Sequence, residues 1–284
     1  MAAVALKGGV KSLARRTLPL AWRQRCAIWL DRQRWLPSGR WWAAELIRDM
    51  ADEDVDAYHR FLWKHHLGYA DTYEVEQRFG PSRIHPTRRM LFEDLERVYA
   101  ARGGDLGQDV RSVFEVGCSL GYLLRWTETD VLEHPETLEG VDIDERAVEQ
   151  GRGYLAAQGS IVTLRAADMG RVGELLEGRV FDLFLCCGVL MYTREQQAAE
   201  IVRAMLDHGK IVAISGLAHP EKDNLHLEGS AVRERDGTFI HNIDRMVTEA
   251  GGRVLERRWE GPRSIDGNTI YSLICAGKLT EVAP

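Results

Sequence analysis

Short apolar runs alternate with stretches of helical periodicity from about residue 111 to the end of the chain. The apolar runs that predict strands are 112–116, 138–143, 161–168, 181–187 and 210–216. The stretches with helical spacing that follow them are 123–132, 144–158, 172–176, 194–206 and 239–251. Two further strand-like runs, 253–259 and 269–277, close the chain with no helix between them. This order predicts an α/β fold with a doubly wound sheet of seven strands, mainly parallel, whose last strand is antiparallel.

The part of the chain before this alternation has a helical pattern. Apolar residues recur with helical spacing in 39–50 and 54–69, and the stretch 86–104 opens with a proline and ends with two glycines. Proline at the first helical position and glycine after the last one are the expected boundaries of a helix. The predicted division is an N-terminal helical region (1–104), made of a basic amphipathic segment (1–40) and cap helices (41–104), and an α/β domain (105–284).

Positive charge is concentrated at the start of the chain. Residues 1–40 contain nine basic side chains and one acidic one, a net charge of +8, so the other residues carry −14 of the total of −6. A helix that starts at Pro19 would place on one face Leu18, Trp22, Cys26, Trp29 and Leu30. This face predicts either an interfacial helix that contacts an anionic membrane or a lipid-like substrate, or a helix that docks on its own domain with a solvated basic face. Docking is the commoner use of such a face, and we favour it.

Composition excludes several classes of protein. The chain has 284 residues, 45% of them hydrophobic, and no run of 18 apolar residues that would predict a membrane-spanning helix. Its five cysteines form no CxxC pair, and three lie in strand-like runs, which is typical of reduced thiols in a cytosolic protein. The acidic α/β part has no basic stripe interleaved with aromatic residues, so we expect no nucleic-acid partner. We predict a cytoplasmic protein, with peripheral membrane contact through residues 1–40 as the alternative.

The stretch 113–124, VFEVGCSLGYLL, leads an apolar strand into a glutamate and then into a glycine turn. It lacks the central and final glycines of the GxGxxG dinucleotide fingerprint, and it lacks the GK[ST] of a P-loop. Glu115 at the strand end would also repel a phosphate. A parallel sheet binds its ligands at the carboxyl ends of the strands, and this turn lies at that edge. The turn therefore suits a ligand with cationic or hydroxyl groups.

Two aspartates end the next two predicted strands. Asp142 follows Gly117 by 25 residues, the position at which a carboxylate accepts hydrogen bonds from both ribose hydroxyls. Asp168 lies at the same edge of the sheet, within reach of an adenine amino group. With Glu115, these residues predict an adenosine ligand that has a positively charged tail and no phosphate.

Four motifs carry a resemblance to a known family: VFEVGCSLGYLL, GVDID, RAADM and FDLFLCCGVLMY. In this order and spacing the chain resembles the class I S-adenosylmethionine-dependent methyltransferases, over roughly residues 105–278. The resemblance implies a Rossmann-like sheet, S-adenosylmethionine as cofactor and S-adenosylhomocysteine as product. Ser119 stands where many members have glycine, and a serine is small enough to keep the site.

The same resemblance implies roles for individual residues. Glu115, Gly117 and Gly121 would face the methionine part of the cofactor. Asp142 would hold the ribose and Asp168 would reach the adenine, while residues 187–190 border both cofactor and acceptor in the family. The predicted cofactor-binding residues are Glu115, Gly117, Cys118, Ser119, Gly121, Asp142, Ile143, Asp168, Met169 and Cys187.

Two acidic residues near this edge have structural interpretations, and no metal site is expected. We expect Asp144 to cap the helix that follows it, and Asp182 to be structural rather than catalytic. No histidine–acid spacing in the chain resembles a zinc or magnesium site, so we predict no metal.

The acceptor side of the site is harder to predict. An amine acceptor needs little acid–base help, whereas a hydroxyl benefits from a general base. His219, in the loop after the fifth predicted strand, is the first candidate for that base, ahead of His226 and His241, although loop histidines more often lie at the surface. Tyr192, after the fourth strand, is placed to orient an acceptor hydroxyl or amine. Residues that belong either to a lid over the cofactor or to ordinary core between helices are Tyr69, Tyr73 and Phe79.

The sequence thus predicts transfer of a methyl group to an oxygen or nitrogen of a small-molecule or glycoconjugate acceptor. Three alternatives stay open. The acceptor could be lipid-linked and membrane-associated, or the chain could bind the cofactor without turnover, as a subunit of an assembly. A nicotinamide oxidoreductase is the third, and the missing central glycine counts against it.

Overall fold

The computed structural model describes residues 18–33, 43, 46–47, 49–65, 67, 78–80, 83–233, 237–265 and 268–278. The chain divides into two compact units, residues 1–73 and 74–284. Helix α7 (Pro86–Ala101), which the sequence analysis assigned to the N-terminal region, belongs to the second unit. Its apolar side, with Leu91 and Leu95, is buried against the sheet of that unit, and this packing moves the boundary to an earlier residue.

Within the described residues, the first unit contains α2 (Leu20–Arg32), α4 (Met50–Glu53) and α5 (Val55–Lys64). Its core is small and apolar. Arg23 of α2 is also buried; it donates to the carbonyl oxygen of Leu46 at 3.1 Å and pairs with Asp49 at 2.5 Å. Because a buried guanidinium needs partners, this pairing fixes α2 to the segment before α4. The core residues are Ala27, Ala43, Ile47, Met50, Tyr58, Leu62 and Leu67.

The opposite side of α2 is exposed. Trp22 and Trp29 are 60% and 57% exposed and Leu18 is 43% exposed. Leu30, which the sequence pattern grouped with them, is instead half-buried against the core of the unit. The helix therefore docks on its own unit through Arg23 and its neighbours, and the predicted apolar face is divided between core and solvent.

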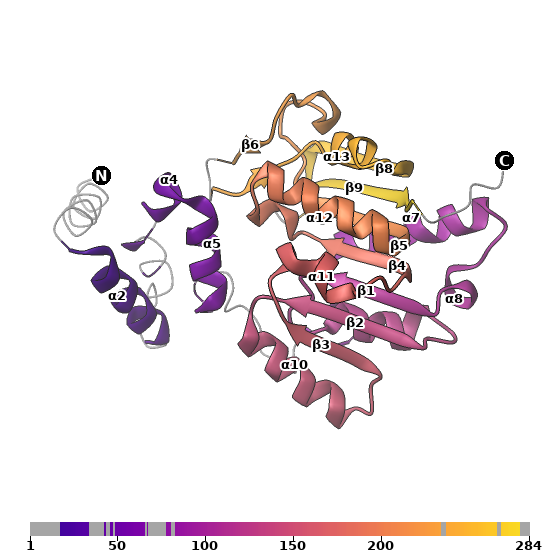
Figure 1. Ribbon diagram of the computed structural model, residues 1–284, viewed down its shortest axis with the longest axis horizontal. Helices are drawn as coiled ribbons and strands as arrows, with labels where there is room; N and C mark the ends of the chain where they lie inside the picture. The colour runs from indigo at the N-terminus through magenta and orange to yellow at the C-terminus, as the bar shows by residue number, and fades with distance from the viewer. Residues whose placement is uncertain are drawn as a thin grey trace. The chain divides into compact units, whose positions relative to one another are not determined.

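The second unit is built on one seven-stranded sheet, with order β3-β2-β1-β4-β5-β9-β8 (Figure 1). Strands β1 to β5 are parallel, and β9 pairs antiparallel with β5. The predicted α/β class, the seven strands and the antiparallel last strand are confirmed. The strands are β1 (Ser112–Val116), β2 (Thr137–Asp142), β3 (Val162–Ala166), β4 (Phe181–Cys187), β5 (Gly209–Gly216), β8 (Arg253–Ile265) and β9 (Asn268–Ala276).

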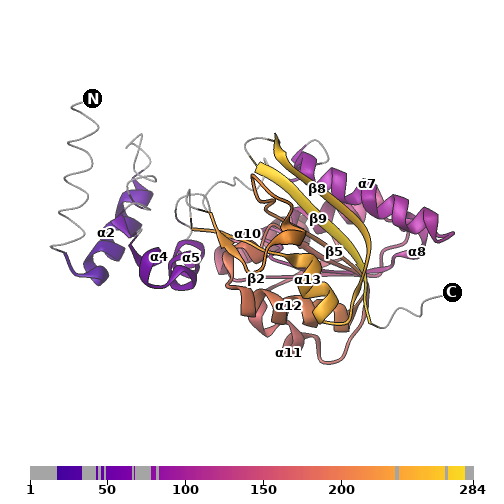
Figure 2. The same ribbon diagram turned by 90° about the horizontal axis from the view of Figure 1, so that it is seen from above.

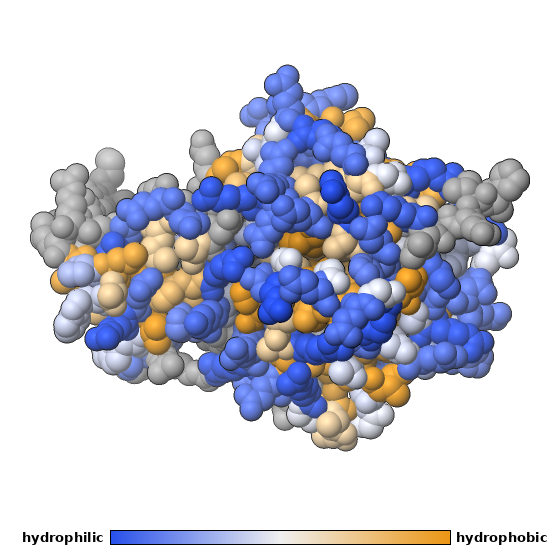
Figure 3. Space-filling view, viewed as in Figure 1, coloured by the Kyte–Doolittle hydropathy of each residue, from blue (hydrophilic) through white to orange (hydrophobic). Residues whose placement is uncertain are grey.

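Helices cover both faces of this sheet (Figure 2). Side chains alternate along each strand, so Leu183 and Leu185 of β4 pack under α7 and its neighbours, whereas Phe184 and Cys186 pack under α12 and its neighbours. Hydrophilic residues cover most of the face of this unit shown in Figure 3. The α7 side of the sheet also carries α8 (Leu106–Asp109), α9 (Tyr122–Trp126) with the π turn η3 (Thr127–Val131), and α10 (Glu145–Ala157). The other side carries α11 (Val172–Leu176), α12 (Glu195–His208) and α13 (Ile243–Glu249).

A segment inserted between β5 and α13 forms its own small structure. It contains the short turn η6 (Asn224–His226) and a two-stranded sheet of β6 (Ala231–Val232) and β7 (Phe239–Ile240). The predicted helix over 239–251 is therefore too long at its start, because Phe239 and Ile240 pair with β6. The helix begins only after Asn242, whose Oδ1 caps it by accepting from the backbone N–H of Arg245 at 2.9 Å.

Candidate active site

The glycine turn between β1 and α9 is shaped by left-handed backbone. Gly117, Ser119 and Gly121 have φ of 73°, 50° and 77°. A Cβ on Gly117 would lie 2.2 Å from Cγ2 of Val189, so the residue after the fourth strand closes directly over this glycine. On the other side, a Cβ on Gly151 of α10 would lie 2.3 Å from the carbonyl oxygen of Leu120. Close packing on both sides holds the turn in one conformation.

Asp142, the last residue of β2, is bonded to this turn. Its Oδ2 accepts from the backbone N–H of Ser119 at 2.7 Å, and its Oδ1 accepts from the backbone N–H of Asp144 at 2.9 Å. Burial raises the pKa of Asp142 to about 6, against the effect of these backbone hydrogen bonds, which lower it. Asp144 in turn caps α10 by accepting from the N–H of Ala147 at 2.9 Å, as expected. Each carboxylate oxygen of Asp142 keeps a further lone pair for a ligand donor.

Glu115 lies on β1, the strand next to the one that ends at Asp142, and it is more deeply buried than Asp142. It is 4% exposed, and its Oε2 has no hydrogen-bond partner among the described groups. Burial raises its pKa to about 8; the guanidinium of Arg88 lowers that pKa and the charge of Asp142 raises it. A buried acceptor without a donor is costly, and such groups commonly mark the place of a ligand.

Arg88 also lies at this edge, and the sequence pattern does not single it out. It extends from the first turns of α7, and its Nη2 donates to the carbonyl oxygen of Cys187 at 2.8 Å, at the end of β4. A Cβ on Gly188, which has φ of 72°, would lie 3.0 Å from the same nitrogen. The guanidinium of Arg88, held at the end of β4, is therefore close enough to the carboxyl of Glu115 in β1 for its positive charge to lower the pKa of that carboxyl.

The remaining predicted cofactor residues lie at the same edge. Asp168, half-buried after β3, accepts from the N–H of Gly170 at 2.9 Å and caps the turn η4 (Met169–Arg171). Met169 packs against the core on the α12 side, and Ile143 is half-buried. Burial raises the pKa of the Cys118 thiol well above its usual range and that of Cys187 to about 11, so both are neutral thiols.

Tyr192 and the first histidine candidate lie on the loops after β4 and β5. Tyr192 is half-buried at the end of the turn η5 (Leu190–Tyr192). His219 accepts through Nδ1 from the backbone N–H groups of Glu221 and Lys222, at 3.2 and 3.4 Å. With Nδ1 accepting, the neutral ring carries its proton on Nε2. This geometry makes His219 the cap of a turn, and its role as a base stays a prediction.

The other two histidines differ in burial. His226 is exposed in η6, whereas His241 is 3% exposed. The Nδ1 of His241 lies 2.6 Å from the hydroxyl of Ser230 and its Nε2 lies 2.9 Å from the carbonyl oxygen of Leu190. Burial lowers the pKa of His241, which favours a neutral ring. His241 therefore links the inserted segment to the turn that carries Tyr192.

Asn224 anchors the same inserted segment, and the sequence pattern does not single it out. Its Nδ2 donates to the carbonyl oxygens of Leu217 and His241, at 2.9 and 2.8 Å. Its Oδ1 accepts from the backbone N–H of His219 at 2.8 Å and from the indole N–H of Trp259 at 3.0 Å. The side chain is fully buried, and these four bonds hold the loop in a fixed place beside β5.

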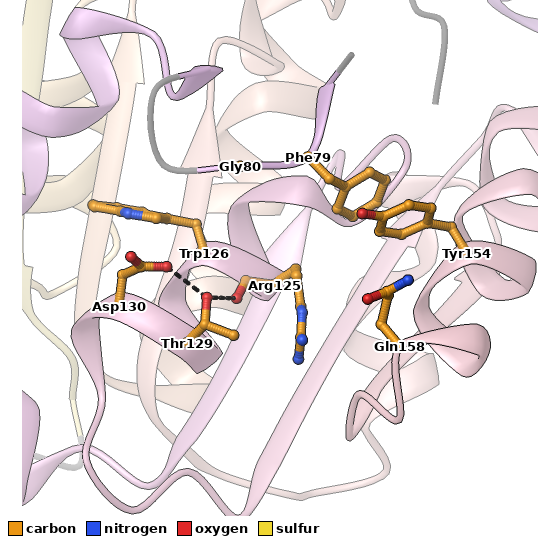
Figure 4. Close-up of a pocket in the computed structure, with 8 residues that line it drawn as sticks. All are labelled: Phe79, Gly80, Arg125, Trp126, Thr129, Asp130, Tyr154 and Gln158. Atoms are coloured by element: carbon orange, nitrogen blue, oxygen red, sulfur yellow. Dashed lines mark hydrogen bonds between the residues drawn. The ribbon is translucent and has the colours of Figure 1, made fainter. Parts of the chain in front are cut away.

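Phe79 lines a pocket beside α9 and α10 (Figure 4). Its ring stacks on that of Tyr154 with centroids 4.1 Å apart, and the cavity of about 160 Å³ beside them is also lined by Trp126 and Arg125. Tyr154 lies nine residues into α10, about 13 Å along the helix from the strand edge. Phe79 thus packs on the flank of the sheet, while Tyr69 and Tyr73 lie outside the described residues.

Asp182, expected to be structural, lies at the start of β4, at the amino ends of the strands. It accepts from the backbone N–H groups of Arg111 and Ser112 and from Lys210.

The described residues contain no group of three or more His, Cys, Asp or Glu side chains that could hold a metal ion. Within the same residues, no helix is both long and apolar enough to cross a membrane.

The family model described as "Methyltransferase domain" matches residues 113–210. The chain carries a methyltransferase domain. The match runs from β1 into β5, so this methyltransferase domain contains the glycine turn, Asp142, Asp168 and Cys187, and the seven-stranded sheet around it is the Rossmann-like class I fold. A comparison with curated proteins gives no match.

Several solved structures resemble the methyltransferase domain and its surroundings. The [4+2]-cyclase SpnF is 14% identical with a TM-score of 0.50, covering 66% of this chain and 80% of its own. Magnesium protoporphyrin IX methyltransferase of Synechocystis PCC 6803 with bound SAH is 15% identical with a TM-score of 0.49, covering 82% and 99%. The N-terminal domain of EvdMO1 with SAH and D-fucose is 16% identical with a TM-score of 0.48, covering 70% and 85%. At these identities the likeness concerns the fold alone.

Proposed function

We propose that the chain is an S-adenosylmethionine-dependent methyltransferase that transfers a methyl group to an oxygen or nitrogen of a small-molecule or glycoconjugate acceptor. The observation that carries the proposal is the convergence of Glu115, Asp142 and Asp168 on the carboxyl ends of three adjacent strands, around the left-handed glycine turn. This arrangement falls within the residues that match the methyltransferase family.

The residues at this edge fit the chemical groups of that cofactor. The unpartnered Oε2 of Glu115 would accept from the ammonium of its amino-acid end, and Arg88 would bind the carboxylate of the same end. A carboxylate and a guanidinium side by side complement an α-amino acid, which carries both charges. Asp142 would accept from the ribose hydroxyls and Asp168 from the adenine amino group.

When bound, S-adenosylmethionine supplies an electrophilic methyl group on a sulfonium, whose sulfur keeps the bonding electron pair as the methyl leaves. The tasks of the chain are to align the acceptor with this methyl and to exclude water. Tyr192, Met191 and Leu217 border the acceptor side, and the anchors Asn224 and His241 hold the loops that carry them. With Nδ1 of His219 engaged in a turn, an amine acceptor that releases its proton to water needs the least from this site.

The cellular setting and one alternative function also need to be considered. All five cysteines are free thiols, which supports a cytoplasmic setting. The resemblance in fold to a [4+2]-cyclase favours keeping a second candidate, a chain that binds the cofactor without transferring its methyl group. Binding and transfer therefore need separate measurements.

The test is calorimetric titration of the full chain with S-adenosylhomocysteine, and with NAD and ATP for comparison. We expect saturable binding of S-adenosylhomocysteine alone, weakened in Asp142→Ala and unchanged in Glu149→Gln, an exposed glutamate on α10. Acceptors are then screened by the mass gain of one methyl group. Binding of NAD in preference to S-adenosylhomocysteine would overturn the proposal, and binding without transfer to any acceptor class would favour the non-catalytic subunit.

A further inference from the structure

Helix α2 has two faces with different surroundings. Arg23 and Ala27 lie on the face that is buried in the core of the first unit, with Arg23 held by Leu46 and Asp49. Trp22 and Trp29, seven residues apart and thus two helical turns along one side, lie on the opposite face and are 60% and 57% exposed. Docking of the helix on its own unit therefore leaves its two tryptophans outside.

The exposed side has a composition that favours one kind of partner. Leu18, two residues before the start of the helix, is 43% exposed. Arg25 is exposed and lies beside the two tryptophans on the helix surface. Indole rings with an apolar body and a polar N–H are favoured at the boundary between lipid and water, and arginine beside them favours anionic headgroups. We call Leu18, Trp22, Arg25 and Trp29 the tryptophan face.

Positive charge is concentrated in the part of the chain that contains the tryptophan face, which favours contact with an anionic surface. Residues 1–40, which contain the tryptophan face, carry +8, while residues 41–284 carry −14. A negatively charged bilayer attracts the first segment and repels the rest of the chain, so charge would present this end of the chain to the surface. The described residues contain no helix suited to crossing a membrane, so contact through α2 would be peripheral.

We propose that the tryptophan face of α2 is a docking surface for the headgroup region of an anionic lipid bilayer. Trp22, Trp29 and Leu18 insert at the level of the headgroups and Arg25 pairs with lipid phosphates. Arg23 stays within the unit, bonded to Leu46 and Asp49. Association of this kind is reversible and weakens with ionic strength, since part of the free energy is electrostatic. It would bring the proposed methyltransferase to acceptors that are dissolved in or linked to a membrane.

The experiment is flotation of the full chain with vesicles of phosphatidylcholine alone and of phosphatidylcholine with phosphatidylserine, at low and high salt. We expect binding to the anionic vesicles, reduced by high salt, and at least about tenfold weaker in Trp22→Ser/Trp29→Ser and in Arg25→Glu. Ile161→Ser is the matched control, because Ile161 is also an exposed apolar side chain, 44% exposed, but lies in the second unit. This control should bind as the original chain does.

Three results would overturn the proposal. The first is no binding of the original chain to anionic vesicles, and the second is equal binding by the double tryptophan variant. The third is a drop from dimer to monomer in the double variant, measured by sedimentation velocity without lipid, which would assign the face to a second copy of the chain. Titration of the same protein with S-adenosylhomocysteine needs no lipid, so a failure of docking and a failure of the proposed function are distinguished. Because the substituted side chains are exposed, thermal melting should be unchanged and confirms folding.

Discussion

The backbone N–H of Ser119 donates to Oδ2 of Asp142 at 2.7 Å, and this bond joins the glycine turn after β1 to the end of β2. Ser119 has φ of 50°, a left-handed conformation that disfavours most side chains. The hydrogen bond offsets this strain. It also joins Asp142, predicted to hold the ribose, to the turn predicted to face the methionine end of the ligand.

Substitutions at Ser119 should follow its backbone conformation. Ser119→Gly is expected to keep the free energy of unfolding within about 1 kcal/mol of the original, because glycine adopts positive φ without strain. Ser119→Val should lose about 2 kcal/mol or more, since a β-branched side chain at positive φ is strongly disfavoured. Chemical denaturation of both variants measures the difference. Equal stability of the two would show that the turn relaxes to another conformation.

Ligand affinity should depend on pH through Glu115. Burial raises its pKa to about 8, so the unliganded carboxyl holds a proton at neutral pH. An ammonium group on the ligand favours the carboxylate, so binding releases a proton, and affinity for S-adenosylhomocysteine should rise between about pH 6 and 8, by up to about tenfold per pH unit. Calorimetry in buffers of different ionisation enthalpy counts the released protons. In Glu115→Gln the affinity should be lower and should depend less on pH, because only Asp142, with its pKa of about 6, still titrates near this range.

The same carboxyl should affect folding in the opposite direction. Its folded pKa lies above the ordinary value of 4.5, so between about pH 4.5 and 8 the unfolded chain ionises while the folded chain stays protonated. The contribution of Glu115 to the free energy of unfolding of the unliganded chain should therefore fall as pH rises through this window, by up to about 1.4 kcal/mol per pH unit. Glu115→Gln should remove this contribution, whereas Glu149→Gln should not. A constant difference between Glu115→Gln and the original chain across the window would contradict the shift.

Arg88 should affect the amino-acid end of the ligand and spare the nucleoside. Arg88→Met is expected to weaken S-adenosylhomocysteine binding about tenfold or more, because a hydrogen-bonded charge pair is lost. 5′-Methylthioadenosine lacks the amino acid, so its affinity should change by less than about threefold. Arg88→Lys should restore part of the difference. A parallel loss for both ligands would mean that Arg88 acts only through its bond to the carbonyl of Cys187.

Substitutions at His219 should distinguish two roles for this residue, the cap of a turn and a general base. Asparagine can accept the same backbone hydrogen bonds, so His219→Asn should retain the transfer rate within about threefold if the residue only caps its turn. His219→Ala should lose about 1 kcal/mol of stability with the cap. Rates for both variants across pH, with thermal melting, test this. A fall of about 10²-fold or more in the transfer rate of His219→Asn, with thermal melting unchanged, would instead show that His219 acts as the general base that takes the proton of the acceptor.

Most of the sheet could be predicted because its signals are local. Apolar runs of β1, β4 and β5 lie where the pattern placed them, and Asp144 caps α10 as a helix start should. The glycine turn and the acidic strand ends also follow from short motifs. These features depend on residues near one another in the sequence, so one sequence contains the information.

The rest depends on contacts between distant residues. Arg88 reaches the end of β4 only because α7 packs across the sheet, and nothing in the pattern of α7 marks this arginine among its neighbours. The division of the chain into residues 1–73 and 74–284 differs from the predicted boundary for the same reason, since the pattern of α7 does not show which unit the helix packs on. The sequence places His219 in a loop but does not show that its Nδ1 accepts from the backbone N–H groups of Glu221 and Lys222, because that contact depends on the loop's conformation.

Asn224 donates to the carbonyls of Leu217 and His241, the two points where the chain leaves β5 and returns to α13. Asn224, which itself lies in the inserted segment, thus holds the two ends of that segment together. A loop closed at its base adds little conformational cost when its middle is lengthened or exchanged. We therefore expect insertions around residues 228–233, between these two anchors, to leave the glycine turn and Asp142 unchanged.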